Sequence, residues 1–302
     1  MNSESFVARL RWLHRLTVVG LVSSVPLCSN HLNRFDDTVA TMYTVALWLM
    51  WGVMLVCVMV PASSSLTVIR VASTAHLVTL TALSLTHTVQ VAPVVAVALA
   101  LACTLLTYTA EMGNEFVQGS AYGAERRFLL KPPAAHVAVQ VVMFAVWYAS
   151  TFAALALVAD ARWWPGAPVA VVAVVCAVVL PSRFHRYSRR WLVSVPAGLV
   201  VHDHVVLAET AMFTHADVRS VTVFDPRDSR TASGDAPADL SGDSVGDRSP
   251  RSAGVVVTLA DFDTVVLAAT RRGDAPRPVH VRSFVVRPAR IARTVAALTR
   301  GD

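Results

Sequence analysis

The sequence predicts an α-helical transmembrane bundle of six spans, followed by a small β-rich domain that ends in a helix. Composition is the first reason: the chain has 302 residues, 55% of them apolar and only 15% charged, whereas a soluble globular protein carries about 25% charged residues. The second reason is a change of pattern near Trp191, where long uncharged segments give way to short runs of β-branched residues. We therefore expect a transmembrane domain over residues 1–182 and a β domain over residues 183–302.

The first apolar segment, residues 16–28, follows Arg9, Arg11 and Arg15, and a helix over about residues 12–29 would contain it. A basic stretch before a short apolar one is also typical of a secretory signal peptide. No small-x-small cleavage site follows, and the run Pro26-Leu27-Cys28 lacks the small residue that a lipoprotein site has before its cysteine. We therefore expect an uncleaved first transmembrane helix.

Five further spans are expected from apolar segments long enough to cross a hydrocarbon core of about 30 Å. In chain order they cover residues 38–60, 66–88, 93–110, 136–159 and 166–181. The last segment is short, but Trp163 and Trp164 before it suit a membrane interface, and the arginines after it can extend toward water.

Basic residues predict the orientation of these spans. The net charge is +6, and all of this excess lies in residues 1–190, because residues 191–302 carry 13 Arg against 13 Asp and Glu. With the N-terminus in the cytoplasm, eleven basic residues flank the spans on the cytoplasmic side, and only Arg34 and Arg162 lie on the other side. The positive-inside rule then predicts a multi-pass protein of the plasma (inner, cytoplasmic) membrane with both termini cytoplasmic. Since the basic excess has this explanation, nucleic acid is not expected as a partner.

Seven short runs rich in β-branched residues predict the strands of the soluble domain. They cover residues 191–195, 199–202, 205–209, 218–224, 254–260, 264–268 and 280–286. A helix from Pro288 to Thr299 is expected after them, because proline suits the first position of a helix. Ile291, Val295 and Leu298 would form its apolar stripe.

Seven short strands followed by one amphipathic helix resemble a bacterial pleckstrin-homology-like (PH-like) domain over about residues 190–300. The stretch 116–128, followed by Lys131-Pro132-Pro133, is similar to loops in polytopic membrane proteins of actinobacteria. No activity is assigned to that family, so the resemblance implies no catalytic residues, and it makes the loop 111–135 the most characteristic part of the chain. A plain small β-barrel or sandwich is the alternative fold.

Residues 226–253 interrupt the predicted strands. They are rich in Ser, Asp, Gly, Pro and Arg and contain no aromatic residue. Such a composition buries too little apolar surface to offset the loss of chain entropy. We therefore expect a disordered insert.

Ionisable residues in or beside the predicted spans are the first candidates for function. His76 and His87 lie eleven residues apart, which places them about 20° apart on one helix face. They are about 16 Å apart along the helix axis, so they cannot share one metal ion. Glu111 and Glu115 would share a face at the start of the following loop. These four residues are the candidates for a polar pathway; the alternatives are interhelical hydrogen bonds for the histidines and a charged helix end for the glutamates.

A second group of candidates consists of basic residues at the predicted cytoplasmic face. They are Arg126, Arg127, Arg183, Arg186, Arg189 and Arg190. Each could contact a partner or a lipid headgroup, at about 1 kcal/mol per arginine near an anionic surface. The alternative is a role in membrane topology alone.

The sequence contains no GxxxxGK[ST], HExxH or GxGxxG motif, and its single GxSxG match, residues 242–246, lies within the polar segment 226–253. The four cysteines stand alone in apolar stretches, and His202-Asp203-His204 is expected to form a turn rather than a metal site. We therefore expect no cofactor and no metal. An enzyme of lipid or cell-wall synthesis that uses Glu111, Glu115 and Glu125 is the least favoured hypothesis.

Two other function classes remain. The first is a membrane-anchored interaction protein whose charge-neutral β domain binds a protein or lipid partner, for instance by β-augmentation at a sheet edge. The second is a transporter or lipid-handling protein with a polar path around His76 and His87. Membrane lipids are expected partners in both classes.

Overall fold

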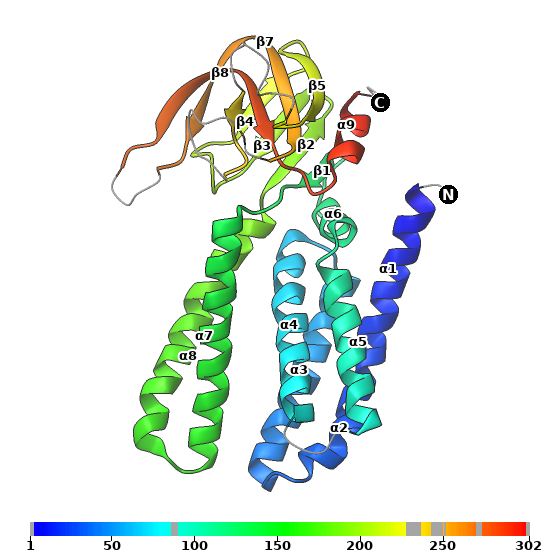
Figure 1. Ribbon diagram of the computed structural model, residues 1–302, viewed down its shortest axis with the longest axis vertical. Helices are drawn as coiled ribbons and strands as arrows, with labels where there is room; N and C mark the ends of the chain where they lie inside the picture. The colour runs from blue at the N-terminus through cyan, green and yellow to red at the C-terminus, as the bar shows by residue number, and fades with distance from the viewer. Residues whose placement is uncertain are drawn as a thin grey trace. The chain divides into compact units, whose positions relative to one another are not determined.

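The computed structural model describes residues 3–85, 90–227, 237–242, 250, 252–269 and 274–299 (Figure 1). The chain folds into two compact units. A helical unit comprises Met1–Gly119 and Val141–Phe184, and a β unit comprises Ser120–Gln140 and His185–Asp302.

Eight α-helices and one short 3-10 turn account for the described part of the helical unit. They are α1 (Ser3–Gly20), the 3-10 turn (Leu21–Ser23), α2 (Ser24–Leu32), α3 (Asp37–Met59), α4 (Ser63–Leu85), α5 (Val91–Thr107), α6 (Ala110–Gln118), α7 (Ala134–Ala159) and α8 (Trp163–Ser188), with the first residues of α7 and the last residues of α8 belonging to the β unit. Asp36 fixes the start of α3, because its carboxylate accepts the backbone N–H groups of Thr38 and Val39.

Four of these helices, α3, α4, α7 and α8, are long and apolar enough to cross a membrane. Helices α5 and α6 pass the same test only as a pair, and they are bent by 63° at the break between them. The described residues thus contain four or five candidate spans, where six were expected. The chain is an integral membrane protein that also carries a β-rich unit.

The first predicted span differs most from the structure. Instead of one helix over residues 12–29, the chain forms α1 and α2 with the 3-10 turn between them. Pro26 in the first turn of α2 explains the break, because in a continuous helix its ring would collide with the carbonyl group of Val22. Three arginines and His14 also make α1 much less apolar than the other long helices.

The β unit consists of two four-stranded sheets and a C-terminal helix (Figure 1). The first sheet is antiparallel and has the order β1 (Arg126–Leu129), β2 (Trp191–Val195), β3 (Gly198–His202), β4 (Ala211–Thr214). The second has the order β5 (Val218–Phe224), β7 (Gly254–Leu267), β8 (Arg277–Val286), β6 (Ala238–Asp239), with β6 parallel to β8. The helix is α9 (Ile291–Thr299).

Strand β1 comes from the segment between α6 and α7, far from the other strands in sequence. It pairs with β2 from Arg126↔Ser194 to Leu129↔Trp191. The backbone N–H of Lys131 donates to the carbonyl of Arg287, at 2.8 Å. Residues expected to be a loop between spans are therefore part of the β unit. The chain leaves this unit in the first part of α7 and enters it again in the last part of α8.

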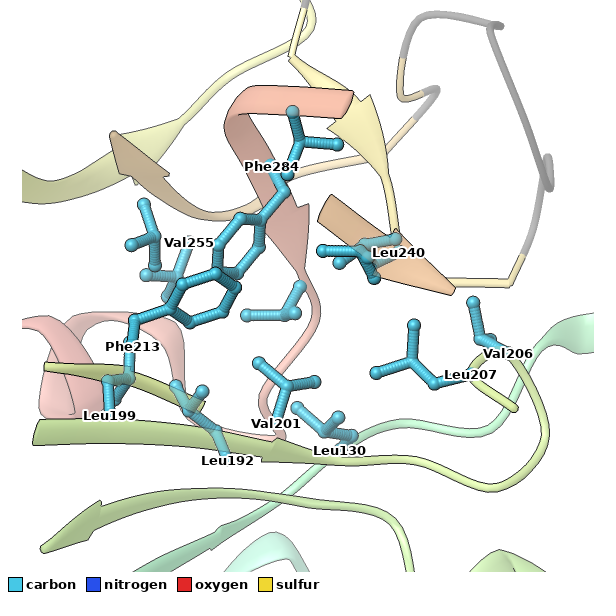
Figure 2. Close-up of a cluster of buried hydrophobic side chains, with 14 of the residues drawn as sticks. Leu130, Leu192, Leu199, Val201, Val206, Leu207, Phe213, Leu240, Val255 and Phe284 are labelled. Atoms are coloured by element: carbon cyan, nitrogen blue, oxygen red, sulfur yellow. The ribbon is translucent and has the colours of Figure 1, made fainter. Parts of the chain in front are cut away.

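The core of the β unit lies between its two sheets. Figure 2 shows Phe213 of β4 facing Phe284 of β8, and their ring centroids are 5.0 Å apart. Ile291, Val295 and Leu298 of α9 pack against this core, which confirms the predicted apolar stripe. Gly198 occurs where β3 passes β4, because a side chain there would collide with the carbonyl oxygen of Phe213.

Several strand predictions need correction. Residues 205–209 do not form a strand: the first of them lie in a turn held by Asp203, whose carboxylate accepts the N–H of Val205, and Leu207 forms an isolated bridge with Leu267. Strand β4 was not predicted, and the runs 254–260 and 264–268 form one strand, β7, with an irregular register in between. The last helix begins at Ile291 rather than at Pro288, which instead forms a bridge with Leu130.

The predicted disordered insert 226–253 is ordered in its middle. Residues 238–239 form β6 beside β8, and the next residue, Leu240, is only 2% exposed in the core. The Asp239 carboxylate accepts the backbone N–H of Ser241. The segment is therefore attached to the sheet both by its pairing with β8 and by the buried Leu240, whereas residues 228–236, 243–249 and 251 lie outside the described part.

Truncation of Leu240 tests this attachment. Leu240→Ala is expected to destabilise the β unit by about 2 kcal/mol, the lower end for a buried leucine, because a short segment can relax into the space. Hydrogen exchange of the β8 amides in the intact protein measures the change. The matched control is Val223→Ala at an exposed edge position, and equal exchange in both variants would show that the segment is not anchored through Leu240.

Candidate functional site

Buried polar side chains gather inside the helical unit, in a region we call the polar seam. On α1 and α2 the seam contains His14, Thr17, Ser24 and His31, spaced three and seven residues apart, so they share a face. Helices α4 and α5 contribute Ser73, His76, Thr79, Thr104 and Thr107, which are also buried. Buried polar groups are costly in an apolar environment unless they are hydrogen-bonded, so their partners define the seam.

His14 connects α1 to α5. Its Nε2 lies 2.8 Å from the hydroxyl oxygen of Thr107, which donates to the carbonyl of Cys103. The Thr17 hydroxyl donates to the carbonyl of His14, and the indole N–H of Trp51 on α3 donates to the carbonyl of Val18. These specific polar contacts therefore connect helix α1 to α3 and α5.

His76, a predicted pathway residue, lies at the centre of the seam. It is 0% exposed, and its Nε2 is 3.2 Å from the Ser24 hydroxyl on α2. Its Nδ1 makes no hydrogen bond with the residues that the structure describes. The contact with Ser24 is an interhelical hydrogen bond, the alternative set out above, and the open Nδ1 leaves one nitrogen available to a further ligand or proton. His87 lies outside the described residues.

Glu111 and Glu115 both lie on α6, as predicted, but in different environments. Glu111 is buried, whereas Glu115 accepts a hydrogen bond from the Arg11 guanidinium at 2.7 Å. Since Arg11 precedes His14 by one helical turn, this ion pair lies at one end of the polar seam. The structure thus brings Glu115 to the seam through Arg11, a residue that sequence reasoning did not select. The spacing of His14, Thr17, Ser24 and His31 was the signal that could have revealed the seam.

The six arginines predicted to contact a partner or a lipid headgroup differ in exposure and in pairing. Arg126, Arg183, Arg186 and Arg189 are exposed, and Arg186 donates to the carbonyl of His204. Arg127 is paired with Glu125 at 2.8 Å. The Arg127 guanidinium holds the pKa of the Glu125 carboxyl below its usual value by donating hydrogen bonds to it.

Arg190 is the exception, and its assignment as a lipid or partner contact is wrong. Its side chain is 0% exposed and forms a bidentate pair with Asp203, at 2.8 and 2.7 Å. It also donates to the carbonyl oxygens of Lys131 and Ser241. Helix α8 ends at Ser188 and β2 begins at Trp191, so the last arginine of the basic run turns into the β unit. Arg190 therefore joins the segment before α7, the β3 turn and the segment after β6.

A stack of rings lies beside Arg127. Its guanidinium is 5.2 Å from the Trp191 ring, Trp191 lies parallel to His202 at 4.9 Å, and His202 meets His204 edge-on at 4.3 Å. Burial lowers the pKa of His202 to about 4, and the nearby His204, Arg189 and Arg127 contribute in the same direction. His202 is therefore neutral at pH 7.

Acid is expected to destabilise the β unit through His202. Its pKa is about 4 in the folded chain against 6.5 ordinarily, so the unfolded chain binds the proton more tightly. The destabilisation is absent above pH 6.5 and grows as the pH falls toward the folded-state pKa. His202→Gln removes this titration, so its thermal midpoint should fall less than that of the wild type between about pH 7 and about pH 5. The same fall in both proteins would exclude His202 as the cause.

Among the described residues, no group of three or more His, Cys, Asp or Glu side chains is placed to hold a metal ion. No family model, curated protein or solved structure matches this chain. The resemblance to a PH-like domain is therefore not confirmed, and functional hypotheses depend on the polar seam, the β unit and the exposed arginines.

Proposed function

We propose that the protein is a membrane-anchored interaction protein whose β unit binds a protein partner at the cytoplasmic face. The observation that carries this proposal is the pairing of β1 with β2. Because β1 precedes α7 and β2 follows α8, the binding module is joined to a pair of candidate spans at two points in the chain.

The surface of the β unit suits a protein better than a polyanion. The basic excess of the unit lies in residues 120–140 and 185–190, next to α7 and α8 in the chain, whereas residues 191–302 carry no net charge. Large apolar side chains are exposed at the outer strands, namely Met212 on β4 and Val223 on β5. Each of these strands is at the end of its sheet, so its outer edge can accept a further strand. Two sheets closed by a C-terminal helix also support the PH-like fold, which we propose together with the expected kinship to actinobacterial membrane proteins.

The proposed topology has six crossings, an even number that keeps both termini in the cytoplasm. Residues 3–32 are about 45 Å long as a helix, so α1 and α2 together can cross a core of about 30 Å despite their break. The contacts of His14 with Thr107 and of Ser24 with His76 support this, because they place both helices beside α4 and α5. Labelling of Arg34→Cys and Arg126→Cys by a membrane-impermeant maleimide tests it: only the first should react from the outer side.

Photo-crosslinking in cells tests the interaction itself. A photoreactive amino acid at position 212 or 223 should form an adduct with one protein of defined mass. The same residue at Val174, an exposed position on α8, is the control for encounters within the membrane. The proposal fails if positions 212 and 223 yield no adduct or the same adducts as position 174.

A transporter or lipid-handling protein is the second candidate, and the buried His76 with its open Nδ1 favours it. Purified protein in vesicles with a pH-sensitive dye inside tests for a proton path. His76→Leu should abolish any flux while Thr81→Val, which removes only a hydroxyl that donates to its own helix, should preserve it. A flux that is absent in the wild type, or unchanged in His76→Leu, would remove this candidate.

A further inference from the structure

The helical unit contains an apolar groove that the proposed interaction function does not use. It has a volume of about 420 Å³ and is lined by residues of α3, α4, α7 and α8. Its lining includes Leu49, Val53, Val68, Trp147, Leu155 and Phe184.

The hydroxyl groups in the groove lining are already hydrogen-bonded within the protein. The Tyr148 hydroxyl donates to the carbonyl of Ala75 and lies 2.6 Å from the Thr79 hydroxyl. Thr67 and Thr151 donate to carbonyl groups of their own helices. Because a water molecule needs two to four polar partners, this groove is unsuited to water and suited to an apolar occupant.

The groove is also open to its surroundings. Leu49 is 64% exposed, and Val53 and Val68 are each 42% exposed. All four lining helices are candidate membrane spans, so the surrounding medium at these positions is hydrocarbon. Aromatic walls such as Trp147 suit a flexible chain, whereas helix pairing in membranes favours stripes of small residues.

A positive charge lies at the end of α8 that contributes to the groove. Arg183 is not part of the lining, but it is exposed and directly precedes Phe184, a residue of the lining. Basic residues at the end of a span attract anionic headgroups, with about 1 kcal/mol per arginine. We propose that the groove binds one acyl chain of an anionic phospholipid whose phosphate contacts Arg183.

Photolabelling of the full chain tests this site. The protein is placed in phosphatidylcholine vesicles that contain a trace of phosphatidylglycerol or of phosphatidylcholine with a diazirine in one acyl chain. Adducts should concentrate on the lining residues. Ala46→Phe and Val53→Trp, which fill the groove from two positions on α3, should each lose most of this labelling. Val174→Phe, a change of similar size on an exposed face of α8 outside the lining, should keep it.

The charge is tested separately. Arg183→Gln should reduce the preference for phosphatidylglycerol over phosphatidylcholine by about fivefold, and Arg162→Gln near the other end of α8 should not change it. Labelling spread evenly over exposed apolar residues and insensitive to both filling variants would overturn the site. A disulfide dimer of Leu49→Cys that excludes the label would assign the groove to a second copy instead. An unchanged lipid preference in Arg183→Gln would overturn the assignment of an anionic lipid.

Discussion

Replacing Arg190 with Ala is expected to destabilise the β unit by about 3–5 kcal/mol, because it leaves the Asp203 carboxylate buried without its counter-charge. The same change removes the donors to the carbonyl oxygens of Lys131 and Ser241. Three segments of the β unit therefore lose a shared partner at once. The loss should appear as faster hydrogen exchange in β2 and β3 of the intact protein, together with residues 126–131.

The neighbouring arginine provides the matched control. Arg189→Ala removes the same charge from an exposed position, so its effect should stay within about 0.5 kcal/mol of the wild type. Asp203→Asn should destabilise the unit as well, because Arg190 then keeps an unpaired charge in the interior. Similar exchange in Arg190→Ala and Arg189→Ala would mean that the Arg190–Asp203 pair does not hold the unit together.

Arg190 also illustrates the limit of sequence reasoning. It ends a run of arginines that follows an apolar span, and such a run is typical of residues at a membrane surface. Whether a given arginine faces water depends on where the helix ends and the strand begins, and Asp203, thirteen residues later, determines this through tertiary contact. No local pattern contains that information.

The parts of the fold that could be predicted are those set by local composition. Helices α3, α4 and α7 follow from long apolar segments with at most one charged residue each, and β2, β5 and α9 from local periodicity. Strands β1, β4 and β6 have only two to four residues, and they exist because other strands pair with them. Leu240 belongs to this class: its segment is polar, and only the complementary surface of the core makes it ordered.

The residues of the polar seam also divide into those that could be predicted from local sequence and those that could not. His76 could be selected because an ionisable residue within an apolar span is unusual. Its partner Ser24 could not, because a serine near a proline in a mixed segment is common and its pairing depends on how α2 packs against α4. His14 lies among three arginines of α1, and these predict a position at the membrane interface rather than a buried position between helices.

Phe284→Ala is expected to produce the second large effect, a loss of about 3–5 kcal/mol from the stability of the β unit. Phe284 is fully buried and stacks on Phe213, so its removal leaves a cavity between the two sheets (Figure 2). Phe213→Ala should cost a similar amount for the same reason. The β7 and β8 amides report the change by hydrogen exchange in the intact protein.

The double variant separates the ring contact from simple burial. If the stacked rings attract each other beyond the area they bury, the two single losses should exceed the loss in the double variant by about 0.5–1.5 kcal/mol. Phe262→Ala is the control for size and chemistry, because this phenylalanine of β7 is 61% exposed, and it should change stability by no more than about 0.5 kcal/mol. A Phe284→Ala loss as small as that of Phe262→Ala would contradict a core shared by both sheets. Since β4 and β8 belong to different sheets, the coupling energy measures what this ring pair contributes to the contact between the two sheets.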